Sequence, residues 1–270
     1  MAEPTSSVKV VEVCKVAPPP PSSSGAFASP SSLPLTFFDI RWLRFGPVQR
    51  LYFYEMPTSS ATPLFFDSIL VPKLKASLSY TLQHFLPLAG NLTWPQDSQK
   101  PVLNYVQGDT VSLTIAESCA DFVEATEYHP LVPRLEASHE QAAVMALQIT
   151  VFPNCGFSIG TSIHHAVLDG KSINFFVKSW AHICKHDDQS NSVLPDEMKQ
   201  FYDRVIQDPA ELGTIYLNDY RNKDGSNNRS LMFWEMKLPL DSAIVQKAMS
   251  NIITPPIRLP CPIVSQVLRS

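Results

Sequence analysis

The segment His164-His165-Ala-Val-Leu-Asp169-Gly170 places two imidazoles, a carboxylate and a glycine within seven residues. An imidazole titrates close to neutral pH, so it can take a proton from a hydroxyl group and later return it. Asp169 follows His165 at a spacing of four, and Gly170 allows a tight backbone after it. A bare His-x-x-x-Asp pattern arises easily by chance, so the elements around the segment decide its value.

The residues before the motif predict a β-hairpin that ends at the histidines. Residues 144–152 (VMALQITVF) and 157–165 (FSIGTSIHH) are both typical of strands, and the Pro-Asn-Cys-Gly between them favours a turn. Alternation along the second strand turns the two histidines to opposite faces, so only one of them can serve a given site. His165 shares its face with Phe157, Ile159, Thr161 and Ile163, and His164 shares the other with Ser158, Gly160 and Ser162.

Helical periodicity begins directly after the motif and predicts a helix over residues 171–185. One face of this helix is apolar and consists of Ile173, Phe176, Val177, Trp180 and Cys184. The motif therefore lies at a strand-to-helix turn, which is a far more restrictive placement than the pattern alone. This placement makes His165 a candidate general base, and a core histidine that donates to a backbone carbonyl is the alternative.

The remaining pattern predicts a mixed α/β fold with antiparallel hairpins. Residues 8–16 and 51–56 are typical of strands, and residues 17–34 form a linker rich in proline and serine. A second amphipathic helix is predicted over residues 66–85, with Asp67 as its cap and Pro72 in an early turn. Its apolar stripe is Leu70, Leu74, Leu78, Leu82 and Phe85. Further along, a loop is predicted over residues 187–195, a strand over 231–238 and a short helix over 241–250.

Two rival chemistries have weaker support. A serine hydrolase would need a nucleophile near His165, but Ser162 lies on the opposite strand face and no Gly-x-Ser-x-Gly motif exists. His182 and His186 share a helix face, but the glutamate of a zinc protease is absent and no third ligand is evident. We therefore expect no metal site, and the two histidines are interpreted as a solvated helix end.

Composition excludes several classes of partner. The net charge is −4 and the pI is near 6.0, so nothing favours nucleic acid or an anionic membrane. No apolar run is long enough to span a bilayer, and the N-terminus has no secretion signal. The five cysteines are odd in number and show no Cys-x-x-Cys spacing, which is typical of reduced thiols in a cytoplasmic protein.

The motif His-His-x-x-x-Asp-Gly resembles the active-site motif of chloramphenicol-acetyltransferase-like folds, of peptide-synthetase condensation domains and of the plant BAHD acyltransferases. Other segments choose among the three: LTFFDIRWLRFGPVQRLYFYE (35–55), LKASLSYTLQHFLPLAGNL (74–92) and FYDRVIQDP (201–209) are similar to BAHD proteins. The resemblance covers residues 8–245 and is strongest to the branch that acylates phenolic and anthocyanin glucosides, often with malonyl groups. The segment 35–55 disfavours a condensation domain.

The resemblance implies a chloramphenicol-acetyltransferase-like mixed sheet with flanking helices, in two similar domains around a channel. It implies that His165 takes the proton from the acceptor hydroxyl, whereas Asp169 and Gly170 hold the local structure, Asp169 through an ion pair. An acyl-CoA is then the co-substrate, a phenolic or flavonoid glucoside is the acceptor, and no cofactor is permanently bound. A complete protein of this kind is expected to be a cytoplasmic monomer.

The sequence departs from the family in its second half, where the family's Asp-Phe-Gly-Trp-Gly is absent. The resemblance divides the chain into a first domain (1–190), a crossover segment (191–230), the start of a second domain (231–250) and a tail unlike the family (251–270). We expect a truncated protein whose channel has one wall missing, and therefore weak or no acyl transfer by this chain alone. A non-catalytic fragment that only binds is the alternative.

Overall fold

A computed structural model describes residues 8–21, 29–43, 45–57, 61–119, 129–138, 140–186, 194–202, 206–208 and 211–222. Within these residues, five strands form a mixed sheet in the order β1-β6-β8-β9-β3, in which only β6 and β8 are parallel neighbours. The strands are β1 (Val8–Val16), β3 (Val48–Glu55), β6 (Val111–Ser118), β8 (Met145–Phe152) and β9 (Gly156–Ile163). Every residue of β8 and β9 is buried, so the predicted hairpin forms the centre of the sheet.

The hairpin turn is one residue shorter than the sequence suggests. Gly156 pairs with Phe152 in the ladder, so the loop consists of residues 153–155. Asn154 has a φ of 65°, a left-handed conformation that asparagine tolerates better than most residues do. The turn chemistry was therefore correct, and the glycine belongs to the strand.

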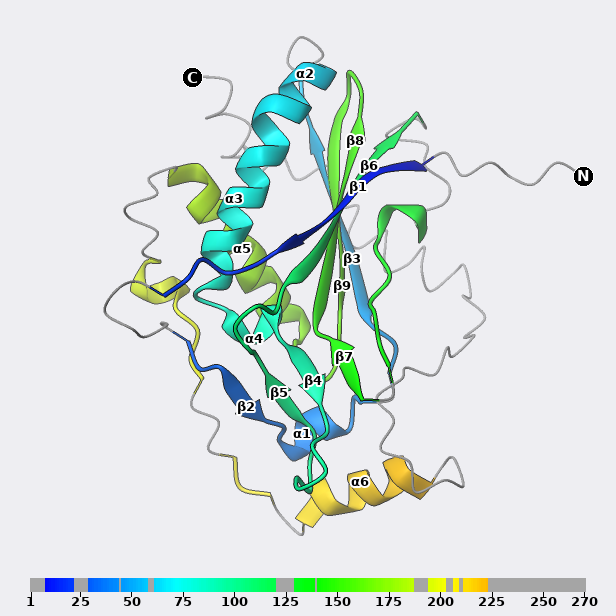
Figure 1. The fold of residues 1–270 in the computed structure, drawn as a ribbon, viewed down its shortest axis with the longest axis vertical. Coiled ribbons are helices and arrows are strands. Elements are labelled where there is room, and N and C mark those ends of the chain that lie inside the picture. Colours follow the sequence, from blue (N-terminus) through cyan, green and yellow to red (C-terminus); the bar gives the residue numbers. More distant parts are fainter. Residues whose placement is uncertain are drawn as a thin grey trace, which may run out of the picture.

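A second, four-stranded sheet lies at one end of the first (Figure 1). Its order is β2-β5-β4-β7, with bounds Ser32–Pro34 for β2, Asn91–Thr93 for β4, Val102–Asn104 for β5 and Gln141–Ala143 for β7. Strand β2 is at the edge, which is where Pro34 can be accommodated. A single residue, Val144, separates the end of β7 from the start of β8, so the chain passes directly from the small sheet into the central hairpin of the large one.

Two long helices, α3 (Val71–Leu82) and α5 (Gly170–His186), pack against each other beside the large sheet (Figure 1). Their predicted apolar faces are confirmed, because the stripe from Leu70 to Phe85 is at most 2% exposed. On α5, Val177 is only half-buried, whereas the other four predicted residues are fully buried. A buried hydrogen bond of 2.9 Å from the indole Nε1 of Trp180 to Ser77 Oγ joins the two helices.

The helix predicted over residues 66–85 begins earlier than expected. Thr62, not Asp67, is the N-cap, and its side chain accepts the amide of Phe65 at the start of α2 (Pro63–Phe65). A π-helical turn (Phe66–Leu70) then leads directly into α3. Pro72 thus lies inside a continuous helix, and since proline lacks an amide hydrogen, the wider turn before it accommodates the missing bond.

Short helices complete the described part: α1 (Phe37–Ile40), α4 (Leu86–Ala89), α6 (Leu212–Asn222), and 3₁₀ turns at His129–Leu131 and Asp196–Met198. Helix α6 lies against α1 at the lower end of the molecule (Figure 1). The predicted elements at 231–238 and 241–250, and the tail 251–270, lie outside the described residues. In the part that is described, no helix has the length and apolarity to cross a bilayer.

Candidate active site

The loop that joins β9 to α5 is fixed by three hydrogen bonds at His164. Its backbone amide donates to Val144 O (2.9 Å), so the ladder continues for one residue beyond β9. Its carbonyl accepts the amide of Val167 (3.0 Å), and its Nδ1 accepts the amide of Ala166 (3.1 Å). The chain therefore turns sharply at this histidine, and the next residue, His165, leaves the strand in a defined direction.

His164 is completely buried, and its ring has no exposed surface. Burial, together with the neighbouring His165, lowers the pKa of His164 to about 3. The ring is therefore neutral at physiological pH, and because Nδ1 accepts a hydrogen bond, its proton lies on Nε2. This histidine supports the loop and does not reach a substrate.

His165 is half-buried, and its ring stacks on the indole of Trp42. The two ring centroids are 4.3 Å apart and the planes are 6° from parallel. Phe45 approaches the same imidazole in an edge-on arrangement, with centroids 6.0 Å apart. Nδ1 of His165 is buried and has no hydrogen-bond partner among the described residues, so Nε2 is the nitrogen that can act as a base. β9 ends at Ile163 and is buried on both faces, so the contrast between the two histidines arises in the turn after the strand and not from alternation along it.

Asp169 faces the helix and not the imidazole. Its Oδ1 accepts the amide of Ser172 at 2.7 Å, and its carbonyl accepts the amide of Ile173 at 3.0 Å. The hydrogen bond from the Ser172 amide is the main cause that lowers the pKa of Asp169. Within the described residues Asp169 makes no ion pair, so the structural role expected of it is here that of a helix cap.

Gly170 lies against the end of another side chain. A Cβ at this position would lie 2.6 Å from Nη2 of Arg50, which reaches over from β3. Arg50 Nη1 and the Tyr52 hydroxyl both donate to Oδ1 of Asn174, at 3.3 and 3.4 Å. Burial raises the pKa of Tyr52, and Arg50 opposes that shift, so the phenol stays protonated. A polar group of three side chains therefore borders the loop.

The described residues offer no arrangement suited to a serine hydrolase or to a metal site. Ser162 is fully buried and its hydroxyl donates to Pro133 O, on the sheet face away from α5. The rings of His182 and His186 lie 4.2 Å apart, and Nδ1 of His186 contacts the carbonyl of His182. Among the residues that can be described, no group of three or more His, Cys, Asp or Glu side chains could hold a metal ion.

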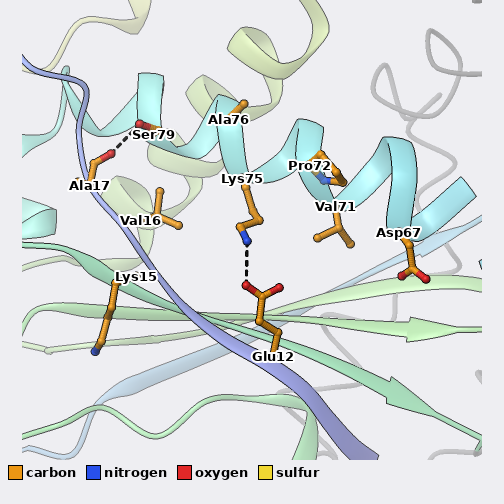
Figure 2. Close-up of a pocket in the computed structure, with 10 residues that line it drawn as sticks. All are labelled: Glu12, Lys15, Val16, Ala17, Asp67, Val71, Pro72, Lys75, Ala76 and Ser79. Atoms are coloured by element: carbon orange, nitrogen blue, oxygen red, sulfur yellow. Dashed lines mark hydrogen bonds and ion pairs between the residues drawn. The ribbon is translucent and has the colours of Figure 1, made fainter.

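Two hollows of the described surface lie away from His165. The first, about 560 Å³, runs between β1 and the helix α3, where Lys75 Nζ contacts Glu12 at 3.1 Å and Ser79 Oγ donates to Ala17 O at 2.6 Å (Figure 2). The second, about 200 Å³, is bordered by Lys15, Arg134 and Glu136. Neither is lined by residues of the loop 164–170, so the candidate site is defined by its side chains and not by a cavity in these residues.

Trp42, Phe45 and Arg50 are residues of the site that the sequence reasoning did not single out. All three come from residues 35–55, more than a hundred positions before His165. Periodicity cannot find such residues, because Trp42 and Phe45 lie in the turn and bend after α1 and Arg50 lies on an edge strand. The only signal was that this segment contributes to the family resemblance.

Comparison with known proteins places this geometry in context. Residues 16–245 match a family model described as the Transferase family. Among similar proteins is phenolic glucoside malonyltransferase 1 of Arabidopsis thaliana, 43% identical over 254 residues, which are 87% of this chain and 52% of that protein. Another is malonyl-CoA:anthocyanidin 5-O-glucoside-6''-O-malonyltransferase of Arabidopsis thaliana, 44% identical over 245 residues, or 86% and 51%. The chain spans about half the length of the curated relatives it matches.

A solved structure supports the fold class. The crystal structure of vinorine synthase superimposes with a TM-score of 0.52 at 22% identity, and the match covers 73% of this chain and 45% of that one. At this identity the likeness concerns the fold alone. It confirms the expected chloramphenicol-acetyltransferase-like mixed sheet with flanking helices.

Proposed function

Since the chain belongs to the Transferase family, the family of the BAHD acyltransferases, we propose that it serves acyl-CoA-dependent O-acyl transfer with His165 as the general base. The acceptor is a hydroxyl of a phenolic or flavonoid glucoside, and the acyl group is malonyl or hydroxycinnamoyl. Relatives named as malonyltransferases of phenolic and anthocyanidin glucosides support this choice of substrates.

The placement of His165 is the observation on which the proposal rests. The ring is half-buried at the end of a central strand, and its Nδ1 is turned inwards. Nε2 then accepts the proton of the acceptor hydroxyl while the oxygen attacks the thioester carbonyl carbon. The tetrahedral intermediate collapses, the carbon–sulfur bond breaks, and the imidazolium returns the proton to the leaving thiolate. No acyl group is attached to the protein, so no nucleophilic side chain is required.

Asp169 and Gly170 have structural parts in this proposal. Asp169 caps α5, and Gly170 makes room for Arg50, so both fix the path of the loop that presents His165. The acyl-CoA is a co-substrate, and no cofactor is held permanently. We further propose that residues 1–190 form a first domain, 191–230 a crossover, and 231–250 the start of a second domain, in a monomeric cytoplasmic protein.

The test measures acyl transfer with malonyl-CoA and a phenolic glucoside, by mass spectrometry of the product and by release of free thiol. It uses the 270-residue chain, and in parallel residues 1–245 continued by the second half of the matched Arabidopsis phenolic glucoside malonyltransferase. His165→Ala should lower the rate by about 10²–10⁴-fold. His182→Ala, on the far part of α5, is the matched control and should leave the rate unchanged.

Transfer that survives His165→Ala at the full rate would refute the general-base role. Glucoside binding without any transfer, unchanged by His165→Ala in both proteins, would favour the alternative of a non-catalytic binding fragment. Equilibrium dialysis with the glucoside separates these outcomes, because a base contributes to turnover and little to binding of the ground state.

A further inference from the structure

We propose that Trp42 is the positioning residue of His165: its indole, and not a carboxylate, holds the imidazole in its working orientation. That this orientation serves catalysis rests on the proposed function, whereas the orientation itself is observed in the structure. The rings are nearly parallel, with centroids 4.3 Å apart and 6° between their planes. Parallel stacking at this distance is an attractive arrangement for aromatic rings.

A histidine base needs a second group that stops its ring from rotating about two side-chain bonds. A carboxylate or carbonyl on Nδ1 commonly supplies that restraint. Here the nearby carboxylate of Asp169 is bonded to the Ser172 amide, and Nδ1 of His165 has no partner within the described residues. The contacts that remain to the ring are aromatic, from Trp42 on its face and from Phe45 at an angle.

The indole is itself held firmly, as a positioning residue must be. The side chain of Asp39 accepts from both the amide and the hydroxyl of Thr36, each at 2.7 Å, which closes a capping box at the start of α1. The Trp42 amide then donates to the Asp39 carbonyl at 2.9 Å. Phe45 packs against the indole with centroids 4.9 Å apart. A segment remote in sequence thereby places its indole against the loop that carries His165.

The same contact stabilises the charge that forms during the reaction. When His165 takes the proton, a cation lies against the electron-rich face of the indole. The exposed Arg41 also lies over the Trp42 ring, with its Cζ 5.6 Å from the ring centroid. Loss of the indole should therefore reduce turnover by about 5- to 30-fold while substrate affinity stays the same.

Nuclear magnetic resonance of the 270-residue chain with ring-labelled histidine tests the orientation without any need for turnover. His165→Gln identifies the resonances of this ring among the seven histidines. We expect upfield ring-current shifts for the His165 ring protons and Overhauser contacts to the indole of Trp42. Trp42→Leu should abolish the upfield shift, and Trp42→Phe should keep part of it.

Trp94→Leu is the matched control. Trp94 also packs on a tyrosine (Tyr220, 6.0 Å between centroids) and under an arginine (Arg221, 5.1 Å from Cζ to the ring centroid), but it follows β4 in the small sheet, away from the Trp42–His165 pair. Its loss should alter stability and leave the His165 resonances in place. If Trp42→Leu does not fold, the Overhauser contacts in the unsubstituted chain give the same answer.

Kinetics of the protein that transfers acyl groups complete the test. Trp42→Leu should lower kcat about 5- to 30-fold with KM unchanged for both substrates, and Trp42→Phe should restore most of the loss. The positioning role is overturned by His165 resonances that ignore Trp42→Leu, by absent contacts between the two rings, or by a loss confined to KM. If neither the unsubstituted protein nor any variant transfers acyl groups, the proposed function is wrong. The resonances of His165 then still decide whether Trp42 holds its ring.

Discussion

The carboxylate of Asp169 and the amide of Ser172 are joined by a hydrogen bond of 2.7 Å, which makes Asp169 the N-cap of α5. The cap lies four residues after His165, so α5, which packs in the core, also anchors the end of the loop that carries His165. Helix capping and the presentation of the proposed base are thus combined in one short segment.

Asp169→Ala should lower the free energy of unfolding by about 0.5–2 kcal/mol, the usual cost of losing a capping side chain. Asp169→Asn should cost much less at neutral pH, because an amide oxygen also accepts from Ser172. The hydrogen bond lowers the pKa of Asp169 in the folded state, so its electrostatic contribution is present above the unfolded pKa near 3.8 and disappears as the pH falls through the lowered value. Urea unfolding at pH 7 and at acid pH measures both effects, and equal losses for Ala and Asn would contradict the cap.

His164 should make stability depend on pH over an unusual range. Its pKa is about 3 in the folded chain and about 6.5 when unfolded, so between these values the unfolded state binds the extra proton. The free energy of unfolding should therefore fall as the pH drops below 6.5, by roughly 1.4 kcal/mol per pH unit, until the pH nears 3. Thermal or urea unfolding across pH 7 to 4 gives the slope.

His164→Asn is the informative comparison for that slope. An asparagine oxygen can accept the Ala166 amide in place of Nδ1, but it cannot take up a proton. The variant should fold at pH 7 and lack this component of the pH dependence. A slope identical to that of the unsubstituted chain would show that His164 is not the group responsible.

The bond between Trp180 and Ser77 should couple the two long helices. Ser77→Ala leaves the buried indole N–H without its acceptor, which typically costs about 1–3 kcal/mol. Trp180→Phe removes the donor and some packing. The double variant should lose less free energy of unfolding than the sum of the two single variants, because it has no unsatisfied indole donor. Urea unfolding measures all three losses. Strict additivity would mean that the hydrogen bond contributes nothing.

The sequence was sufficient wherever periodicity specifies burial. The apolar stripes of α3 and α5 each follow a repeat that the core enforces, so these two helices could be predicted. The hairpin of β8 and β9 could be predicted from its strand-forming residues and its turn, although both faces of these strands are buried. The family resemblance extended the prediction to the fold class.

Other features depend on contacts between distant segments and were missed for that reason. Strand β6 pairs with β1 and β8 across long separations, and the three-residue strands are too short to show a pattern. The cap at Thr62 was missed because the π-helical turn shifts the register of the apolar stripe. The stacking of Trp42 on His165 is likewise tertiary, and the two residues are 123 positions apart.

Gly160, in the middle of β9, offers a last test of how tightly the face opposite α5 is covered. The turn His129–Leu131 and the two residues after it lie on this face, where Gln148 donates to Pro130 O at 2.8 Å and Ser162 donates to Pro133 O. A Cβ at Gly160 would overlap the backbone carbonyl of Leu131, with Val132 Cα at 3.0 Å. Backbone atoms cannot rotate away as a side chain can, so Gly160→Ala must displace the segment.

Gly160→Ala should therefore lower the free energy of unfolding by at least about 1–3 kcal/mol, the usual cost of overpacking. Hydrogen exchange should rise at the amides of Leu131 and Val132 before it rises in α5, because the overlap is on the opposite face. Gly46→Ala is the control: an added Cβ there meets no atom within 4 Å, so its effect should stay within about 0.5 kcal/mol. Unfolding midpoints that coincide for the two variants would mean that the segment 129–133 is not held against β9, and that this face of the central hairpin is open in solution.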